Sequence, residues 1–79
     1  MAISPNPTTR VITVEIISPI SSEFTPGIIQ IMDIYGNLKA EKILDTSVDI
    51  IDVTTLNNGL YRISFIDGQI VLSTLFIKE

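Results

Sequence analysis

The abundance of isoleucine restricts the folds open to this chain more than any other feature. Isoleucine occupies 16 of the 79 positions, and with valine and threonine the β-branched residues number 29. Such side chains are stiff and pack well on a pleated surface, so they favour strands over helices. Between Arg10 and Ile17 apolar and polar residues alternate with the period of a half-buried strand. We therefore predict an all-β protein without a helix of ten residues or more.

Turn-forming residues divide the chain into short strands. Tyr35-Gly36-Asn37, Asn57-Asn58-Gly59 and Asp67-Gly68 are turn signals, because glycine and asparagine tolerate a positive φ. A longer loop is expected over 18–27. The strands expected between these signals cover 10–17, 28–34, 38–44, 48–53, 60–66 and 69–77. Their spacing is typical of a β-sandwich. We predict an immunoglobulin-like antiparallel β-sandwich of six or seven short strands.

The first nine residues differ from the rest of the chain. Pro5 and Pro7 cannot donate to a strand ladder, and their neighbours are polar turn formers. We interpret residues 1–9 as a boundary or linker segment and residues 10–79 as the sandwich domain. A domain of this length buries one thin core. That core leaves no room for a deep active-site cleft between two layers.

The composition argues against most chemistry. Cysteine and histidine are absent, which removes disulfides, thiolate metal sites and the commonest general base. The five basic residues are scattered and the net charge is −4, so we expect no nucleic-acid partner. No apolar run approaches the roughly 20 residues that span a bilayer. We predict no catalytic residues, no metal and no cofactor.

Acidic residues offer two weaker candidates. Asp45, Asp49 and Asp52 are close in sequence and could hold calcium, but they lack the glycine and glutamate of a calcium loop. Surface charge and turn capping explain them more simply. Asp33 and Asp67 could act as an acid–base pair, yet each lies beside a turn. Hydrogen bonding of each carboxylate to nearby backbone is the simpler interpretation.

Aromatic and apolar residues raise the question of a binding surface. Tyr35, Tyr61 or Phe24 could stack against a sugar, although Tyr61 fits the inward face of its strand. Several apolar side chains are expected to point outward. They form either a partner surface or a face covered by the second sheet, and both alternatives remain open. These residues are Ile17, Ile66, Val71, Leu75 and Ile77.

Three segments together resemble a known family. The first is Pro5-Asn6-Pro7 followed by two threonines and an alternating strand. The second is Ile31-Met32-Asp33-Ile34-Tyr35-Gly36-Asn37-Leu38. The third runs from Asp52 to Ile63 through Asn58-Gly59-Leu60-Tyr61 and is completed by Phe76-Ile77-Lys78-Glu79. In order and spacing they are similar to the C-terminal sorting domain of the type IX secretion system, found in secreted proteins of the Bacteroidota.

The resemblance implies a non-catalytic secretion signal. Such a domain directs an N-terminal cargo of the same precursor through the periplasm to the outer-membrane translocon. A surface protease with sortase-like activity then typically removes the domain, and the cargo is secreted or held at the cell surface. The residues implied for translocon recognition are Leu75, Phe76, Ile77, Lys78 and Glu79. Those implied for the boundary are Pro5, Asn6 and Pro7, and those implied for the turns are Gly36, Asn58, Gly59 and Tyr61.

The final strand also suggests how recognition works. A last strand at the edge of a sheet can present unpaired backbone groups to a partner strand. We therefore expect recognition through this edge and its outward apolar residues, and self-association through the same surface stays open. The alternative functions are a small carbohydrate-binding or adhesion module and a passive spacer between domains.

Overall fold

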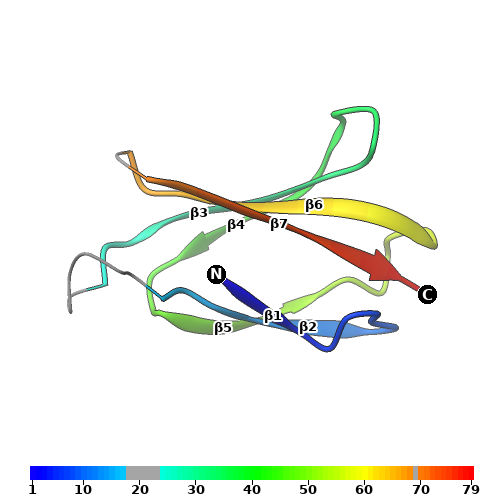
Figure 1. Ribbon diagram of the computed structural model, residues 1–79, viewed down its shortest axis with the longest axis horizontal. Helices are drawn as coiled ribbons and strands as arrows, with labels where there is room; N and C mark the ends of the chain where they lie inside the picture. Colours follow the sequence, from blue (N-terminus) through cyan, green and yellow to red (C-terminus); the bar gives the residue numbers. More distant parts are fainter. Residues whose placement is uncertain (18–23, 69) are drawn as a thin grey trace.

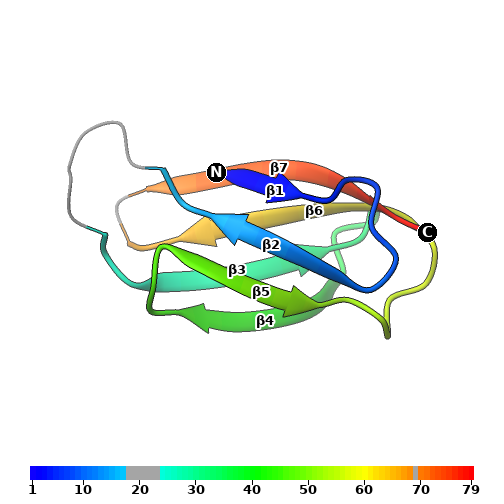
Figure 2. The ribbon, with the colours of Figure 1, turned by 90° about the horizontal axis from the view of Figure 1, so that it is seen from below.

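The computed structural model describes residues 1–17, 24–68 and 70–79, which form seven strands and no helix. The strands build two antiparallel sheets that face each other (Figures 1 and 2). One sheet has the order β1-β2-β5 and the other the order β4-β3-β6-β7. The predicted all-β sandwich is confirmed. The strands are β1 (Ala2–Ser4), β2 (Val11–Glu15), β3 (Gly27–Met32), β4 (Leu38–Leu44), β5 (Val48–Asp52), β6 (Gly59–Ile66) and β7 (Val71–Lys78).

The core lies between the two sheets and follows the predicted alternation. In β2, Ile12 and Val14 are fully buried, whereas Val11 and Glu15 are exposed. Each strand thus turns one apolar face inward and leaves the other outside. The buried core side chains are Ile12, Val14, Ile29, Ile31, Leu44, Ile51, Val53, Tyr61, Ile63, Phe65 and Phe76.

The side chain of Tyr61 connects the beginning of β6 to β7 and to the preceding turn. Its ring stacks on Phe76 of β7, with the ring centroids 5.6 Å apart. Its hydroxyl donates a hydrogen bond of 2.6 Å to the carbonyl of Asn57, four residues upstream. A tyrosine that bonds back to the chain in this way is typical of immunoglobulin-like sandwiches. The inward position predicted for Tyr61 is confirmed.

Charged groups connect the two sheets along one side of the sandwich. Lys42 of β4 forms a 2.8 Å ion pair with Asp49 of β5 and also donates to the carbonyl of Ile50. These two strands are the outer strands of their own sheets. The strand expected over 38–44 is therefore an edge strand, and its ion pair connects it to the opposite sheet.

Three local predictions need correction. Residues 2–4 form β1, which pairs with β2 and was not expected as a strand. Gly59 is the first residue of β6 rather than part of the preceding turn. Asp67, which was expected within the last turn, pairs with Ile70 through both its backbone amide and its carboxylate. Most of the predicted loop over 18–27, and the predicted strand start at position 69, lie outside the described residues.

Candidate recognition surface on the terminal strand

The terminal strand β7 is anchored by its inward side chains. All eight of its residues pair with β6, from Val71 opposite Ile66 to Lys78 opposite Gly59. Phe76 is fully buried, and Lys78 is only 7% exposed, with its ammonium group near the carbonyl of Glu79. Leu75 and Ile77 point outward and are about half exposed. The five residues implied for recognition therefore divide into buried anchors and outward groups.

Residues 5–9, here called the strap, lie along the outer edge of β7. The Thr8 amide donates to the carbonyl of Ile77 at 2.9 Å, and the Glu79 amide donates to the carbonyl of Thr8 at 2.8 Å. Thr8 is thereby paired in parallel with Lys78, and it is 1% exposed. Its hydroxyl donates to the carbonyl of Val11, which ties the strap to the start of β2. The strap comes at the right of Figures 1 and 2, beside the C-terminus.

The side chain of Asn6 extends this pairing by acting in place of a peptide group. Its Nδ2 donates to the carbonyl of Leu75 at 3.2 Å, and its Oδ1 accepts from the amide of Ile77 at 2.9 Å. A residue of a parallel strand would make the same two bonds with its own backbone. The adjacent prolines lack an amide hydrogen, so the asparagine amide supplies the donor that the strap backbone lacks.

The strap corrects the prediction of an open terminal edge. Four outward backbone groups of residues 75–79 are bonded to the strap and close that part of the edge: the Leu75 carbonyl, the Ile77 amide and carbonyl, and the Glu79 amide. Outward and inward groups alternate along an antiparallel pair, so the backbone groups of Val71 and Ser73 face the same edge as those of Ile77. No hydrogen bond of the described residues occupies these groups. Among the described residues the edge is thus open from Val71 as far as the amide of Leu75.

The outer face of the four-stranded sheet carries a row of apolar side chains. The strand register places Ile28 of β3 between Ile43 of β4 and Ile66 of β6, and Ile66 beside Val71. Ile43 is 72% exposed and Val71 is 66% exposed. The second sheet therefore does not cover this face. The sequence analysis did not identify Ile28 and Ile43 as part of this surface. Alternation within 28–34 and 38–44 indicates that both side chains point outward. Only the register between the strands shows that they are neighbours.

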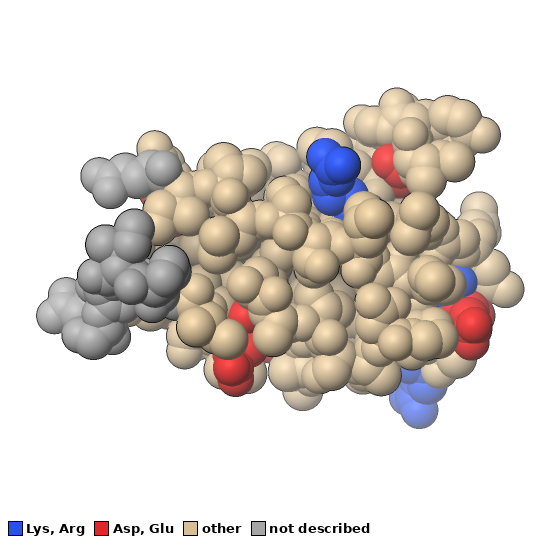
Figure 3. Space-filling model, viewed as in Figure 1, with Lys and Arg blue, Asp and Glu red and all other residues tan. Residues whose placement is uncertain are grey.

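A polar row separates this apolar row from a second apolar area. Gln30 donates to Glu41 at 2.9 Å, and the Ser64 and Ser73 hydroxyls are 2.9 Å apart. Beyond these pairs a groove of about 380 Å³ crosses the same face. Figure 3 shows few charged side chains on the side of the molecule that it presents. The groove is lined by Met32, Asp33, Ile34, Gly36, Leu60, Tyr61, Arg62 and Leu75.

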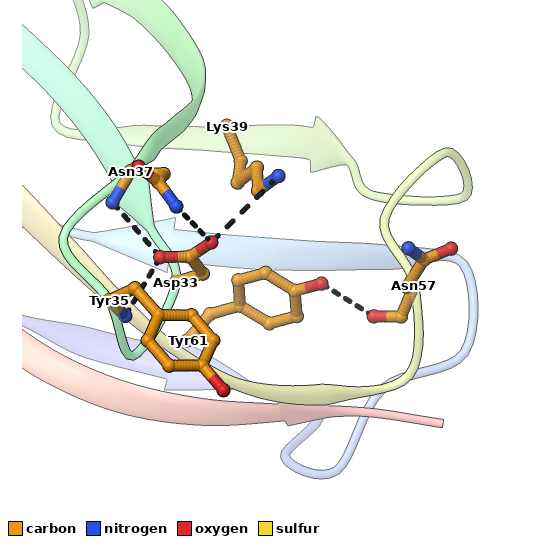
Figure 4. Close-up of polar contacts among 6 residues, drawn as sticks. All are labelled: Asp33, Tyr35, Asn37, Lys39, Asn57 and Tyr61. Atoms are coloured by element: carbon orange, nitrogen blue, oxygen red, sulfur yellow. Dashed lines mark hydrogen bonds and ion pairs between the residues drawn. The ribbon is translucent and has the colours of Figure 1, made fainter.

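The turn beside the groove is organised by Asp33 (Figure 4). Its carboxylate accepts hydrogen bonds from the amides of Tyr35 and Asn37 and from the Asn37 side chain. Lys39 lies 3.8 Å away. These contacts, the Asn37 amide first, lower the pKa of Asp33. Gly36 has a φ of +85°, which the turn requires. The Asp33 carboxylate is therefore engaged within its own turn, as the simpler interpretation predicted.

The other acidic candidates are also engaged locally. The Asp49 carboxylate binds Lys42, and this bond lowers its pKa. Asp52 accepts bonds from the amide and hydroxyl of Thr54, which lower its pKa. In the part of the chain that the structure describes, no three acidic side chains come together as a metal site would require. Asp67 bonds the amide of Ile70 in the last hairpin.

The aromatic candidates do not form a sugar platform. Tyr35 is 82% exposed at the tip of its turn, but Tyr61 is buried and Phe24 packs on Phe65 with centroids 5.9 Å apart. Of the aromatic side chains in the described ranges, Tyr35 is thus the one that presents most of its ring to solvent.

Comparison with known protein families gives a match that covers nearly the whole chain. No helix long and apolar enough to cross a membrane occurs within residues 1–17, 24–68 and 70–79. A search of curated proteins gives no match. A family model, described as the secretion system C-terminal sorting domain, matches residues 2–79, which include β1, the strap and the terminal strand. The chain therefore belongs to the family of type IX secretion C-terminal sorting domains.

Proposed function

We propose that this domain is a non-catalytic signal that directs an attached N-terminal cargo to the type IX outer-membrane translocon. Membership of the sorting-domain family supports a role in secretion and a secreted or cell-surface location for the cargo. The finer steps, namely engagement of the translocon and removal of the domain by a surface sortase-like protease, belong to this proposal. The carbohydrate-binding alternative receives no support from the single exposed tyrosine.

The proposal rests mainly on the hydrogen bonds that join the strap to the terminal strand β7. The boundary residue Asn6 and the terminal residues Leu75 and Ile77 are about 70 positions apart, yet they are joined by hydrogen bonds. The terminal strand is thus held in one shape by β6 on one side and by the strap on the other. Its outward side chains continue the apolar outer face of the four-stranded sheet. A surface of this kind is suited to binding a protein partner.

The test fuses the domain to a periplasmic reporter in a host that has the secretion system. Deleting Phe76 to Glu79 should leave the reporter in the periplasm, but this deletion also removes a core side chain. A sharper variant changes Val71, Leu75 and Ile77 to serine, because all three are exposed. We expect this triple variant to stay folded and to lose export.

The matched control carries three serines on the opposite face. Val11, Val48 and Ile50 are exposed on the outer face of the three-stranded sheet. Their replacement removes a similar apolar area far from β7, so export should persist. Circular dichroism of both purified variants checks that the strands remain. Normal export of a folded β7 triple variant would refute the proposed recognition surface.

A further inference from the structure

We propose that the outer edge of β7 accepts an extended segment of the partner polypeptide, which begins at Val71 and Ser73 and then displaces the strap from residues 75–79. The proposal rests on the proposed function and adds the backbone contact by which the partner binds. In the free domain the strap bonds part of the β7 edge. In the bound domain the strap has left the edge, and the partner strand takes its place.

The open half of the edge is a place where pairing can begin. Val71 and Ser73 turn their amide and carbonyl groups outward, and none of these groups is bonded by the described residues. A sheet edge with free groups is a template for strand addition. The flanking Val71 and Leu75 side chains are exposed and lie on the outer face, so an added strand also gains apolar contacts there.

The closed half is held by few bonds. Thr8 is the only strap residue whose backbone pairs with β7 in the described structure, and Asn6 adds two bonds through its side chain. Pro5 and Pro7 have no amide hydrogen to add. A partner strand without prolines can bond the same carbonyls and amides with its own backbone, and it keeps its bonds to Val71 and Ser73. Such a strand therefore forms more backbone hydrogen bonds with β7 than the strap does.

The first test blocks the place where pairing begins. Ser73→Pro removes the outward amide hydrogen of Ser73, which makes no bond within the domain, and proline is tolerated on edge strands in this orientation. Ser73→Ala is the matched control, because it also loses the hydroxyl contact with Ser64 but keeps the amide. With the reporter fusion we expect export of Ser73→Pro to fall at least about tenfold relative to Ser73→Ala. Equal export of the two folded variants would overturn the proposal.

The second test locks the strap in place. Thr8 and Lys78 are cross-strand partners, so cysteines at these positions can form a disulfide that crosses the strap and β7. The chain has no other cysteine, and each single-cysteine variant is a control. We expect the cross-linked form, identified by its mass without reductant, to be exported at least about tenfold less than either single variant. Export equal to that of the single variants would contradict strap displacement.

A third measurement follows the strap in the purified domain. Asn6→Ala removes the acceptor of the Ile77 amide. Hydrogen exchange at Ile77 should accelerate about tenfold, while the Phe76 amide, which faces β6, should change little. Unchanged exchange at Ile77 would count against a releasable strap. Loss of export in the β7 triple-serine variant, together with normal export of Ser73→Pro and of the cross-linked form, would keep the proposed function and reject this inference.

Discussion

Replacing Phe76 with alanine separates the structural part of the terminal strand from its recognition part. The Phe76 side chain is fully buried and stacks on Tyr61, so its removal leaves a cavity and ends an aromatic contact. Losses of this kind cost about 3–5 kcal/mol in the free energy of unfolding. At about 0.05–0.15 kcal/mol per residue, a chain of 79 residues has roughly 4–12 kcal/mol in total. We therefore expect Phe76→Ala to lose a quarter of its stability or more.

Urea denaturation of the purified domain, followed by circular dichroism, measures this loss. With a slope of about 1 kcal/mol per molar urea, the midpoint should fall by about 3 M, or the variant should be unfolded without urea. The neighbouring Ile77→Ala is the control, because Ile77 is 46% exposed and its truncation should cost less than about 1 kcal/mol. A midpoint shift below about 1 M for Phe76→Ala would refute the reasoning that β7 is anchored through this ring.

Two further predictions concern the rest of the fold. Gly27→Ala should cost about 1–3 kcal/mol in a urea titration, because its new Cβ would lie 2.5 Å from the backbone oxygen of Ile66; an unchanged midpoint would contradict this close approach. The pKa values of three aspartates are lowered, so the stability that they add is present above pH about 4 and is lost as pH falls through the lowered values. Asp33→Asn should flatten the acid part of the stability curve. An acid part as steep as in the original chain would contradict the stabilising role of the Asp33 carboxylate.

Most of the strands could be predicted because the signals that define them are local. Alternation placed Ile63 and Phe65 inside, and Gly36 marked a turn that needs a positive φ. The pairing of Asp67 with Ile70 was not predicted, because the bond from the Ile70 amide to the Asp67 carboxylate is not visible in the pattern of apolar residues.

The strap could not be predicted from local patterns. Pro5 and Pro7 correctly indicate that residues 5–9 are not an ordinary strand, but they do not reveal that Asn6 bonds backbone groups 69 and 71 positions away. The burial of Lys78 is a second feature of this kind, since lysine is rarely buried. Lys78 is buried because the alternation of β7 turns it inward, next to Phe76 along the strand and opposite the strap. The bonds of Asn6 and the burial of Lys78 both depend on pairing between residues that are far apart in the sequence.

The burial of Phe76 near the end of the chain has a consequence for synthesis. A ribosome that stops before position 76 makes a product in which the first three residues of β6 lack their partners and Tyr61 lacks its stacking ring. Such a product also lacks the Ile77 amide that donates to Asn6 and the Ile77 carbonyl that accepts from Thr8. A polypeptide that lacks residues 76–79 is therefore distinguished by its shape from one that contains them.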